Sequence, residues 1–225
     1  LAASALVLLI YNPLLIMEVG FQLSYMAVIG IVIIQPWINN WFSISYWLPR
    51  KIWEITAVSI AAQIATFPLG LLYFHQFPNY FILSNLVVIP AATLILALGI
   101  LVLVTSPITL VSSFFGLILN YAIKVLNWSV VSIEKLPYSL TTGISITVLE
   151  SWLIYGFIIS FFVFIHHKKA KQLSVALLCL ISVLILDVME DQKLQNTQRA
   201  IFYSIGKTSA MDFIVGEKHY FMTDS

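Results

Sequence analysis

The sequence predicts an all-α polytopic membrane protein with about six to seven transmembrane helices, some broken by proline, followed by the beginning of a β-containing extracytoplasmic domain. Three observations support this class. Hydrophobic residues make up 60% of the 225 and charged residues only 9%, whereas soluble domains carry about 25% charged residues. The mean hydropathy is +0.98. Apolar runs of about 20 residues, the length that crosses a bilayer, recur along the chain.

These apolar runs define the expected spans in order. Residues 1–11 form the end of one span, and later spans cover about 20–38, 52–73, 85–105, 107–134, 147–165 and 172–188. Pro68 and Pro90 are expected to break two of them. A break at membrane depth frees backbone carbonyls, which then need a neighbouring helix or a water-filled cavity. We therefore expect residues 61–90 to line a pathway or to form the joint of a gate.

Lysine and arginine near span ends predict the orientation of the chain, because cytoplasmic loops of membrane proteins are enriched in these residues. The cluster HHKKAK at 166–171 and the pair Arg50-Lys51 fall on the same side of the predicted threading. That side is therefore predicted to be cytoplasmic. The hinge at 74–84, the loop at 135–146 and everything after Asp187 are then predicted to lie outside.

The composition changes after the last span and predicts a second domain. The predicted organisation is a transmembrane domain over 1–188, a polar linker over 189–199 and the start of a soluble domain over 200–225. Alternating residues bounded by glycine-containing turns predict strands in this last segment; they cover 200–205, 209–215 and 219–223. Both ends of the sequence look cut, so we expect a fragment of a longer protein.

Polar residues recur at helical spacing in the third span, on one face of the predicted helix; they are Thr56, Ser59, Gln63, Thr66 and Gly70. Close packing of helices through small and hydroxyl residues explains most of this stripe, but explains Gln63 less well.

The run after Pro107 carries a second stripe, made of Ser113, Gly116, Asn120, Lys124 and Asn127. An ionisable residue at membrane depth by default marks a functional site. Alternatively, this helix lies in the interface and Lys124 reaches toward the lipid headgroups. The sequence leaves both interpretations open.

The remaining chemistry-bearing residues do not predict an active site. Glu18 and Glu150 are interpreted as solvated carboxylates near helix ends, and His166-His167 as part of a basic loop. No metal-ligand cluster, phosphate-binding glycine loop or nucleophile elbow occurs in the sequence. We therefore predict no enzymatic activity for these residues, no catalytic residue, no metal and no cofactor. Cys179 is interpreted as a small buried apolar residue.

Several separated motifs, in order along residues 1 to about 105, resemble one family; they are NPLL at 12–15, VGFQLSY at 19–25, AAQIATFP at 61–68, YFHQFP at 73–78 and SNLVVIP at 84–90. The sequence resembles the ComEC family of competence proteins. The resemblance implies a channel in the bacterial plasma (inner) membrane that passes one DNA strand into the cytoplasm during natural transformation. It also implies that 200–225 begins a domain similar to metallo-β-lactamases. The His-x-His-x-Asp-His metal site of such domains is absent from the sequence, so nuclease activity is not assigned.

A path for a DNA strand needs hydrogen-bonding groups and few cations, because phosphate contacts supply most of the non-specific affinity for DNA. The candidate lining residues are Gln22, Ser24, Ser59, Gln63, Thr66, His75, Asn85, Asn120 and Lys124. The expected partners are single-stranded DNA in transit, the lipid bilayer, a DNA receptor and an ATPase motor. Two other functions stay open: a small-solute or ion transporter with broken helices, or an enzyme whose chemistry lies in the soluble domain.

Overall fold

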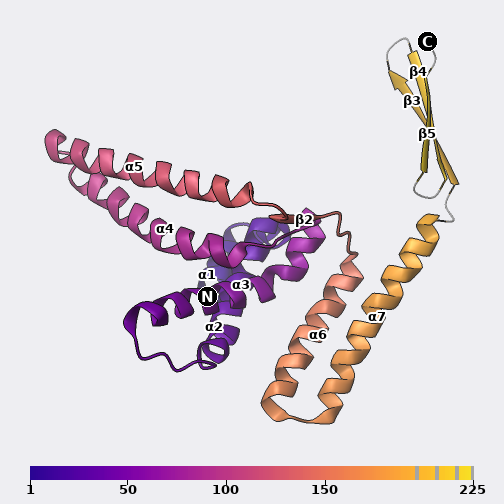
Figure 1. Ribbon diagram of the computed structural model, residues 1–225, viewed down its shortest axis with the longest axis horizontal. Coiled ribbons are helices and arrows are strands. Elements are labelled where there is room, and N and C mark those ends of the chain that lie inside the picture. Colours follow the sequence, from indigo (N-terminus) through magenta and orange to yellow (C-terminus); the bar gives the residue numbers. More distant parts are fainter. Residues whose placement is uncertain (196–197, 206–207, 216–217, 224–225) are drawn as a thin grey trace. The chain divides into compact units, whose positions relative to one another are not determined.

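The computed structural model describes residues 1–195, 198–205, 208–215 and 218–223, and the chain divides into two compact units, Leu1–Ser145 and Ile146–Ser225 (Figure 1). The first unit contains α1 (Ala2–Tyr11), a short 3-10 helix η1 (Pro13–Met17), α2 (Val19–Asn39), α3 (Trp47–Phe74), β1 (Gln76–Pro78), α4 (Phe81–Val104), α5 (Thr109–Glu134) and β2 (Leu140–Thr142). The second contains α6 (Val148–His167), α7 (Ala170–Gln195), β3 (Gln198–Ile205), β4 (Thr208–Val215) and β5 (Lys218–Thr223).

Six helices in the described part of the chain, α2 to α7, are long and apolar enough to cross a membrane. Much of their apolar surface is exposed; the side chain of Leu110, for example, is 84% exposed. A soluble protein rarely leaves so much contiguous apolar surface in water. The predicted class of polytopic helical protein, with a few strands near the C-terminus, is therefore confirmed.

The best-packed part of the first unit is the contact between α2 and α3. On α2, the buried residues Gly30, Ile34 and Ile38 repeat every four positions and so share one face. The facing side of α3 carries buried alanines at the same spacing, at positions 57, 61 and 65. A Cβ atom on Gly30 would overlap the Ala65 side chain and lie 2.6 Å from the Ala61 carbonyl oxygen. Small residues thus bring the two backbones into direct contact.

The predicted proline breaks do not occur. The helices α2, α3 and α4 run continuously through Pro36, Pro68 and Pro90. Each proline removes one backbone donor, so only one ladder bond is lost on each helix. Ending the helix would free many more backbone groups, each of which is costly away from water. Pro68 is in addition fully buried, so neighbouring atoms hold its ring in place.

The predicted hinge between α3 and α4 is joined to the loop between α5 and α6 (Figure 1). Strands β1 and β2 pair antiparallel, with Phe77 opposite Thr141. The Asn79 side-chain amide donates to the Tyr138 carbonyl at 2.7 Å and to the Thr141 hydroxyl at 2.9 Å. The Tyr80 hydroxyl donates to the Pro137 carbonyl at 3.0 Å. We call this pairing of residues 76–80 with 137–142 the clasp.

In the second unit, α6 and α7 pack along each other (Figure 1). Helix α6 begins with a capping box, in which Glu150 accepts hydrogen bonds from the backbone and hydroxyl of Thr147. Glu150 is only 2% exposed, so its interpretation as a solvated carboxylate is wrong. The cap explains the burial, because it gives the carboxylate two protein donors in place of water.

The end of the second unit matches the predicted strands closely. Strands β3, β4 and β5 form an antiparallel sheet in that order. The predicted turn at 206–207 lies outside the described residues, as do the first two residues of the predicted turn at 216–218, whereas Lys218 begins β5. In the segment at 189–199, predicted as a polar linker, α7 continues to Gln195 and β3 begins at Gln198. Glutamate, glutamine and lysine in this segment are good helix formers. The division into two functional domains stays a prediction.

Candidate membrane pathway and a polar cavity

The polar stripe on α3 lies on the side of the helix away from its alanine face. An advance of two residues along a helix rotates the side-chain direction by about 200° about the helix axis. Ser59 and Gln63 therefore point roughly opposite to Ala57 and Ala61. Ser59 is 2% exposed, and its hydroxyl donates to the Ile55 carbonyl of its own helix at 2.8 Å. Thr66 donates likewise to the Ala62 carbonyl at 2.9 Å. These hydroxyls are satisfied locally, which favours helix packing for them.

Gln63 differs from its neighbours on the stripe. It is half-buried, and its side-chain amide makes no hydrogen bond within the described part of the chain. An amide has two donors and one acceptor that need partners away from water. Gln63 is therefore the residue of the stripe best suited to face water or a solute.

Gln22 does not stand free at the membrane surface but ties two elements together. Its amide nitrogen donates to the Ile16 carbonyl in η1 at 2.9 Å, and its amide oxygen accepts from the Tyr73 hydroxyl at 2.8 Å. His75 follows at the end of α3 in the left-handed conformation, with φ of 53°. The structure thus brings Gln22 to the same end of α3 as His75, next to the clasp.

The stripe on α5 is exposed. Asn120, Lys124 and Asn127 all have exposed side chains, whereas half-buried residues such as Leu119 and Leu126 lie on another face. Helix α5 packs against α4. Within the described residues, the Lys124 ammonium has no ion pair or hydrogen bond. The polar stripe therefore stays uncovered in this unit.

The two other predicted residues take separate positions. Ser24 is exposed on α2, and Asn85 is half-buried in the second turn of α4. The nine predicted residues consequently occupy four helices and one helix end of the first unit, and no single cavity collects them. Their role as a lining stays a prediction.

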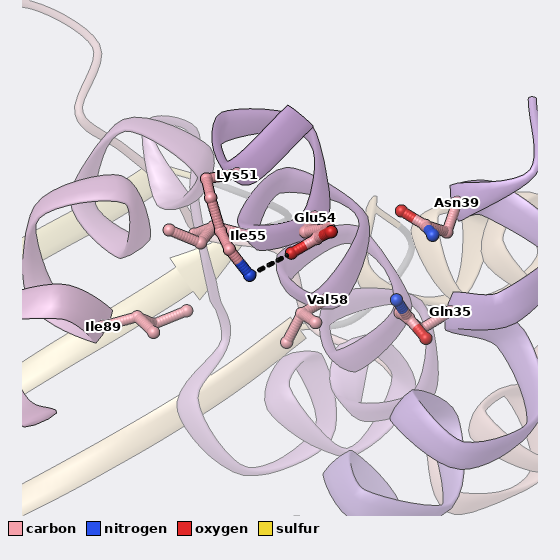
Figure 2. A pocket seen from close by; sticks show the side chains of 7 residues that line it. All are labelled: Gln35, Asn39, Lys51, Glu54, Ile55, Val58 and Ile89. Carbon is pink, nitrogen blue, oxygen red and sulfur yellow. Dashed lines mark hydrogen bonds and ion pairs between the residues drawn. The ribbon is translucent and has the colours of Figure 1, made fainter. Parts of the chain in front are cut away.

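A cavity of about 480 Å³ lies elsewhere, between the end of α2, the beginning of α3 and Ile89 of α4. Figure 2 shows the amides of Gln35 and Asn39 on one side and the ion pair of Lys51 with Glu54 on the other. The Lys51 Nζ atom lies 2.7 Å from Glu54 Oε2, and Arg50 Nε lies 3.8 Å from Oε1. Ile55 and Val58 add an aliphatic wall.

Neighbouring contacts fix the shape of this cavity. The Trp53 indole donates to the backbone carbonyl of Asn39 at 3.1 Å and so ties the end of α2 to α3. The Phe42 ring from the intervening loop meets the Trp53 ring edge-on at 4.8 Å. The Asn39 Oδ1 atom is buried and accepts no hydrogen bond within the described residues. An unpaired buried acceptor is costly, so this atom is suited to a donor from outside the chain.

The sequence patterns did not predict this cavity. Arg50 and Lys51 indicated only the orientation of the chain. Two pairs in the sequence could have indicated it. Gln35 and Asn39 are amides at i, i+4 near the end of one span, and Lys51 and Glu54 are an oppositely charged pair at i, i+3 near the start of the next. That these pairs face each other depends on how α2 packs on α3, which spacing alone does not give.

No group of three His, Cys, Asp or Glu side chains that could hold a metal occurs among the residues that the structure describes. The absence of enzymatic chemistry stays a prediction.

The fold and these polar features define a class: a multi-pass helical membrane protein with uncovered polar side chains on membrane-length helices. A family model described as "Competence protein" matches residues 1–171. The chain therefore belongs to the Competence protein family. It is also 31% identical over 90 residues to ComE operon protein 3 of Bacillus subtilis strain 168. That match covers 40% of this chain and 11% of the relative. No solved structure matches the chain.

Proposed function

We propose that this chain is part of an inner-membrane channel for uptake of single-stranded DNA during competence. The observation that carries the proposal is the exposed polar stripe on α5, a helix of membrane length. Asn120 and Lys124 would be costly if they faced lipid. A water-filled path beside this face removes that cost.

The chemistry of the stripes suits transit of a polyanion. Amides and hydroxyls offer hydrogen bonds, and Lys124 supplies one positive charge. Each further cation would add affinity through release of counterions and would slow departure of the strand. Single-stranded DNA also needs a driving force, and the sequence holds no nucleotide-binding glycine loop. The proposal therefore includes an ATPase motor and a DNA receptor as partners.

The competing function, a small-solute or ion transporter, depended on helices broken at mid-membrane. Because α3 and α4 run through Pro68 and Pro90 without interruption, broken helices no longer support a transporter. The family membership favours competence.

The test replaces Gln63 and Lys124 singly with leucine in the full-length protein of a transformable host. We expect uptake of labelled DNA to fall at least about tenfold at normal membrane abundance, because one desolvated polar contact contributes on the order of 1.4 kcal/mol. Lys135→Leu is the matched control: it removes an exposed lysine at the end of α5 and should leave uptake unchanged. Normal uptake in both leucine variants would refute the pathway role of the stripes.

A further inference from the structure

We propose that the cavity between α2, α3 and α4 binds the headgroup of a phospholipid that carries a primary ammonium group, such as phosphatidylethanolamine. The proposal is independent of DNA transport. It starts from the lining, which combines a polar wall with an aliphatic one. The volume of about 480 Å³ lies within the usual range of small-molecule sites, about 300–1,000 Å³.

The polar wall matches both charges of such a headgroup. Lys51 uses one of its three N–H donors on Glu54, and the others are available to a phosphate, with Arg50 nearby. Two acceptors lie across the cavity from Lys51, the unpaired Asn39 Oδ1 and the Gln35 amide oxygen, and the Glu54 carboxylate lies beside Lys51. An ammonium group, with three donors, can satisfy several acceptors at once.

The Lys51–Glu54 pair is open to such an exchange. The side chains of Lys51 and Glu54 are 52% and 33% exposed. Ion pairs at this exposure contribute little to stability, so both groups can also bind a ligand that carries both charges.

The surroundings place the cavity at the level of lipid headgroups. Trp37, Trp41, Tyr46 and Trp47, all exposed, flank its lining residues along the chain. Tryptophan and tyrosine gather at membrane–water interfaces, where one side of the ring is apolar and the other is wet. The aliphatic wall of Ile55, Val58 and Ile89 would then face the start of the acyl chains. A lipid therefore fits better than a water-soluble ligand.

The experiment measures lipid occupancy of the full-length protein, purified in detergent, by native mass spectrometry. Matched dioleoyl lipids are added with phosphoethanolamine, its N-methyl and N,N-dimethyl forms, phosphocholine or phosphoglycerol as the headgroup. In the wild-type protein, occupancy should fall stepwise as methylation removes N–H donors, by about fivefold in total. Phosphoglycerol should bind about as weakly as phosphocholine. Equal occupancy by phosphocholine or phosphoglycerol lipids would overturn the proposal.

Variants then locate the site. Asn39→Leu, which removes an ammonium acceptor, should abolish the preference for the primary ammonium. Lys51→Leu, which removes a phosphate donor, should lower the occupancy of every phospholipid in the series. The matched controls Asn40→Leu and Lys135→Leu, outside the lining, should keep both the occupancy and the preference. A preference that survives in Asn39→Leu would overturn the assignment. The wild-type methylation series stays decisive if a variant fails to fold.

Two competitors test whether the cavity prefers a lipid, a soluble phosphoethanolamine ester or a nucleic acid. Glycerophosphoethanolamine, which lacks acyl chains, should displace less than a tenth of the bound lipid at 100-fold excess; displacement of most would assign the site to a soluble ester. A single-stranded oligonucleotide should displace none. Displacement by the oligonucleotide would make the cavity part of a nucleic-acid path and overturn the lipid proposal.

Discussion

Gly30 decides how closely α2 and α3 approach. A methyl group there would meet the Ala65 side chain and the Ala61 carbonyl, and a backbone carbonyl cannot move aside without shifting the helix. Overpacking of this kind costs about 1–3 kcal/mol. We therefore expect Gly30→Ala to lower the thermal unfolding midpoint of the purified protein by several degrees, measured by fluorescence-detected size exclusion after heating.

The control for this prediction is Gly99→Ala. Gly99 also lies inside a helix, α4, but a Cβ there meets nothing within 4 Å. Alanine favours the helix over glycine by up to about 1 kcal/mol, so this variant should be neutral or slightly more stable. Equal effects of the two substitutions would show that helix propensity, not close packing, governs both positions.

Ser59 illustrates how a polar residue can be structural. Its buried hydroxyl bonds to a carbonyl that already accepts within the helix, so removing the hydroxyl leaves no unpaired group. Ser59→Ala should therefore keep the unfolding midpoint within about 2 °C and DNA uptake within about twofold, because no buried polar group loses its partner. Loss of uptake at normal abundance would instead support a pathway role for Ser59.

At the scale of elements, the clasp joins two connections that lie far apart in the sequence. Asn79 contributes most to it, through its side-chain bonds to Tyr138 and Thr141 and a backbone bond to Ser139 at 2.9 Å. Asn79→Ala removes its side-chain hydrogen bonds to the 138–142 segment and so lowers the free energy of local opening. Amide hydrogen exchange in that segment should therefore rise by about tenfold.

Asn40→Ala is the matched control for the clasp, since Asn40 is exposed at the end of α2. It should leave exchange at 138–142 unchanged. If Asn79→Ala also left this exchange unchanged, the β1–β2 pairing would not depend on the asparagine.

The elements were largely predictable because each span must bury an apolar surface of fixed length. Hydropathy placed both ends of α2 and α5 and the end of α3 correctly to about two residues, and the strand pattern placed β3 to β5. Helix α3 begins earlier than predicted, at Trp47. Proline at 68 and 90 suggested breaks, but the helices keep their backbone hydrogen bonding through both positions. Hydropathy ended the last span at 188, but residues with high helix propensity extend α7 to Gln195.

The candidate site was less predictable than the fold. Spacing placed Ser59, Gln63 and Thr66 correctly on one face of α3, but it could not tell a hydroxyl bonded to its own helix from an amide without a partner. The cavity depends on tertiary packing: Asn39 and Lys51 line the same cavity because α2 packs on α3, which small residues allow to approach closely. Periodicity carries no information on such pairs.

For the molecule as a whole, the clasp constrains the topology. Strand β1 precedes α4 and strand β2 follows α5, and the two strands pair, so both lie on the same side of the membrane. Helices α4 and α5 must therefore both cross the bilayer or both remain on one side. Their 24 and 26 residues correspond to roughly 36–39 Å, longer than the hydrocarbon core of about 30 Å. This length favours two crossings.

Single-cysteine labelling tests the topology, in a background where Cys179, the one native cysteine, is replaced by alanine. With a membrane-impermeant maleimide on intact cells, Gln76→Cys and Leu140→Cys in the clasp should both react. Ser45→Cys and Ser106→Cys should react only after permeabilisation, because the basic pair Arg50-Lys51 predicts a cytoplasmic position for the first and two crossings place the second with it. Reaction of Ser106→Cys from outside, alongside the clasp, would mean that α4 and α5 lie along the outer interface. Lys124 would then anchor α5 to lipid headgroups, and the pathway role of its stripe would be lost.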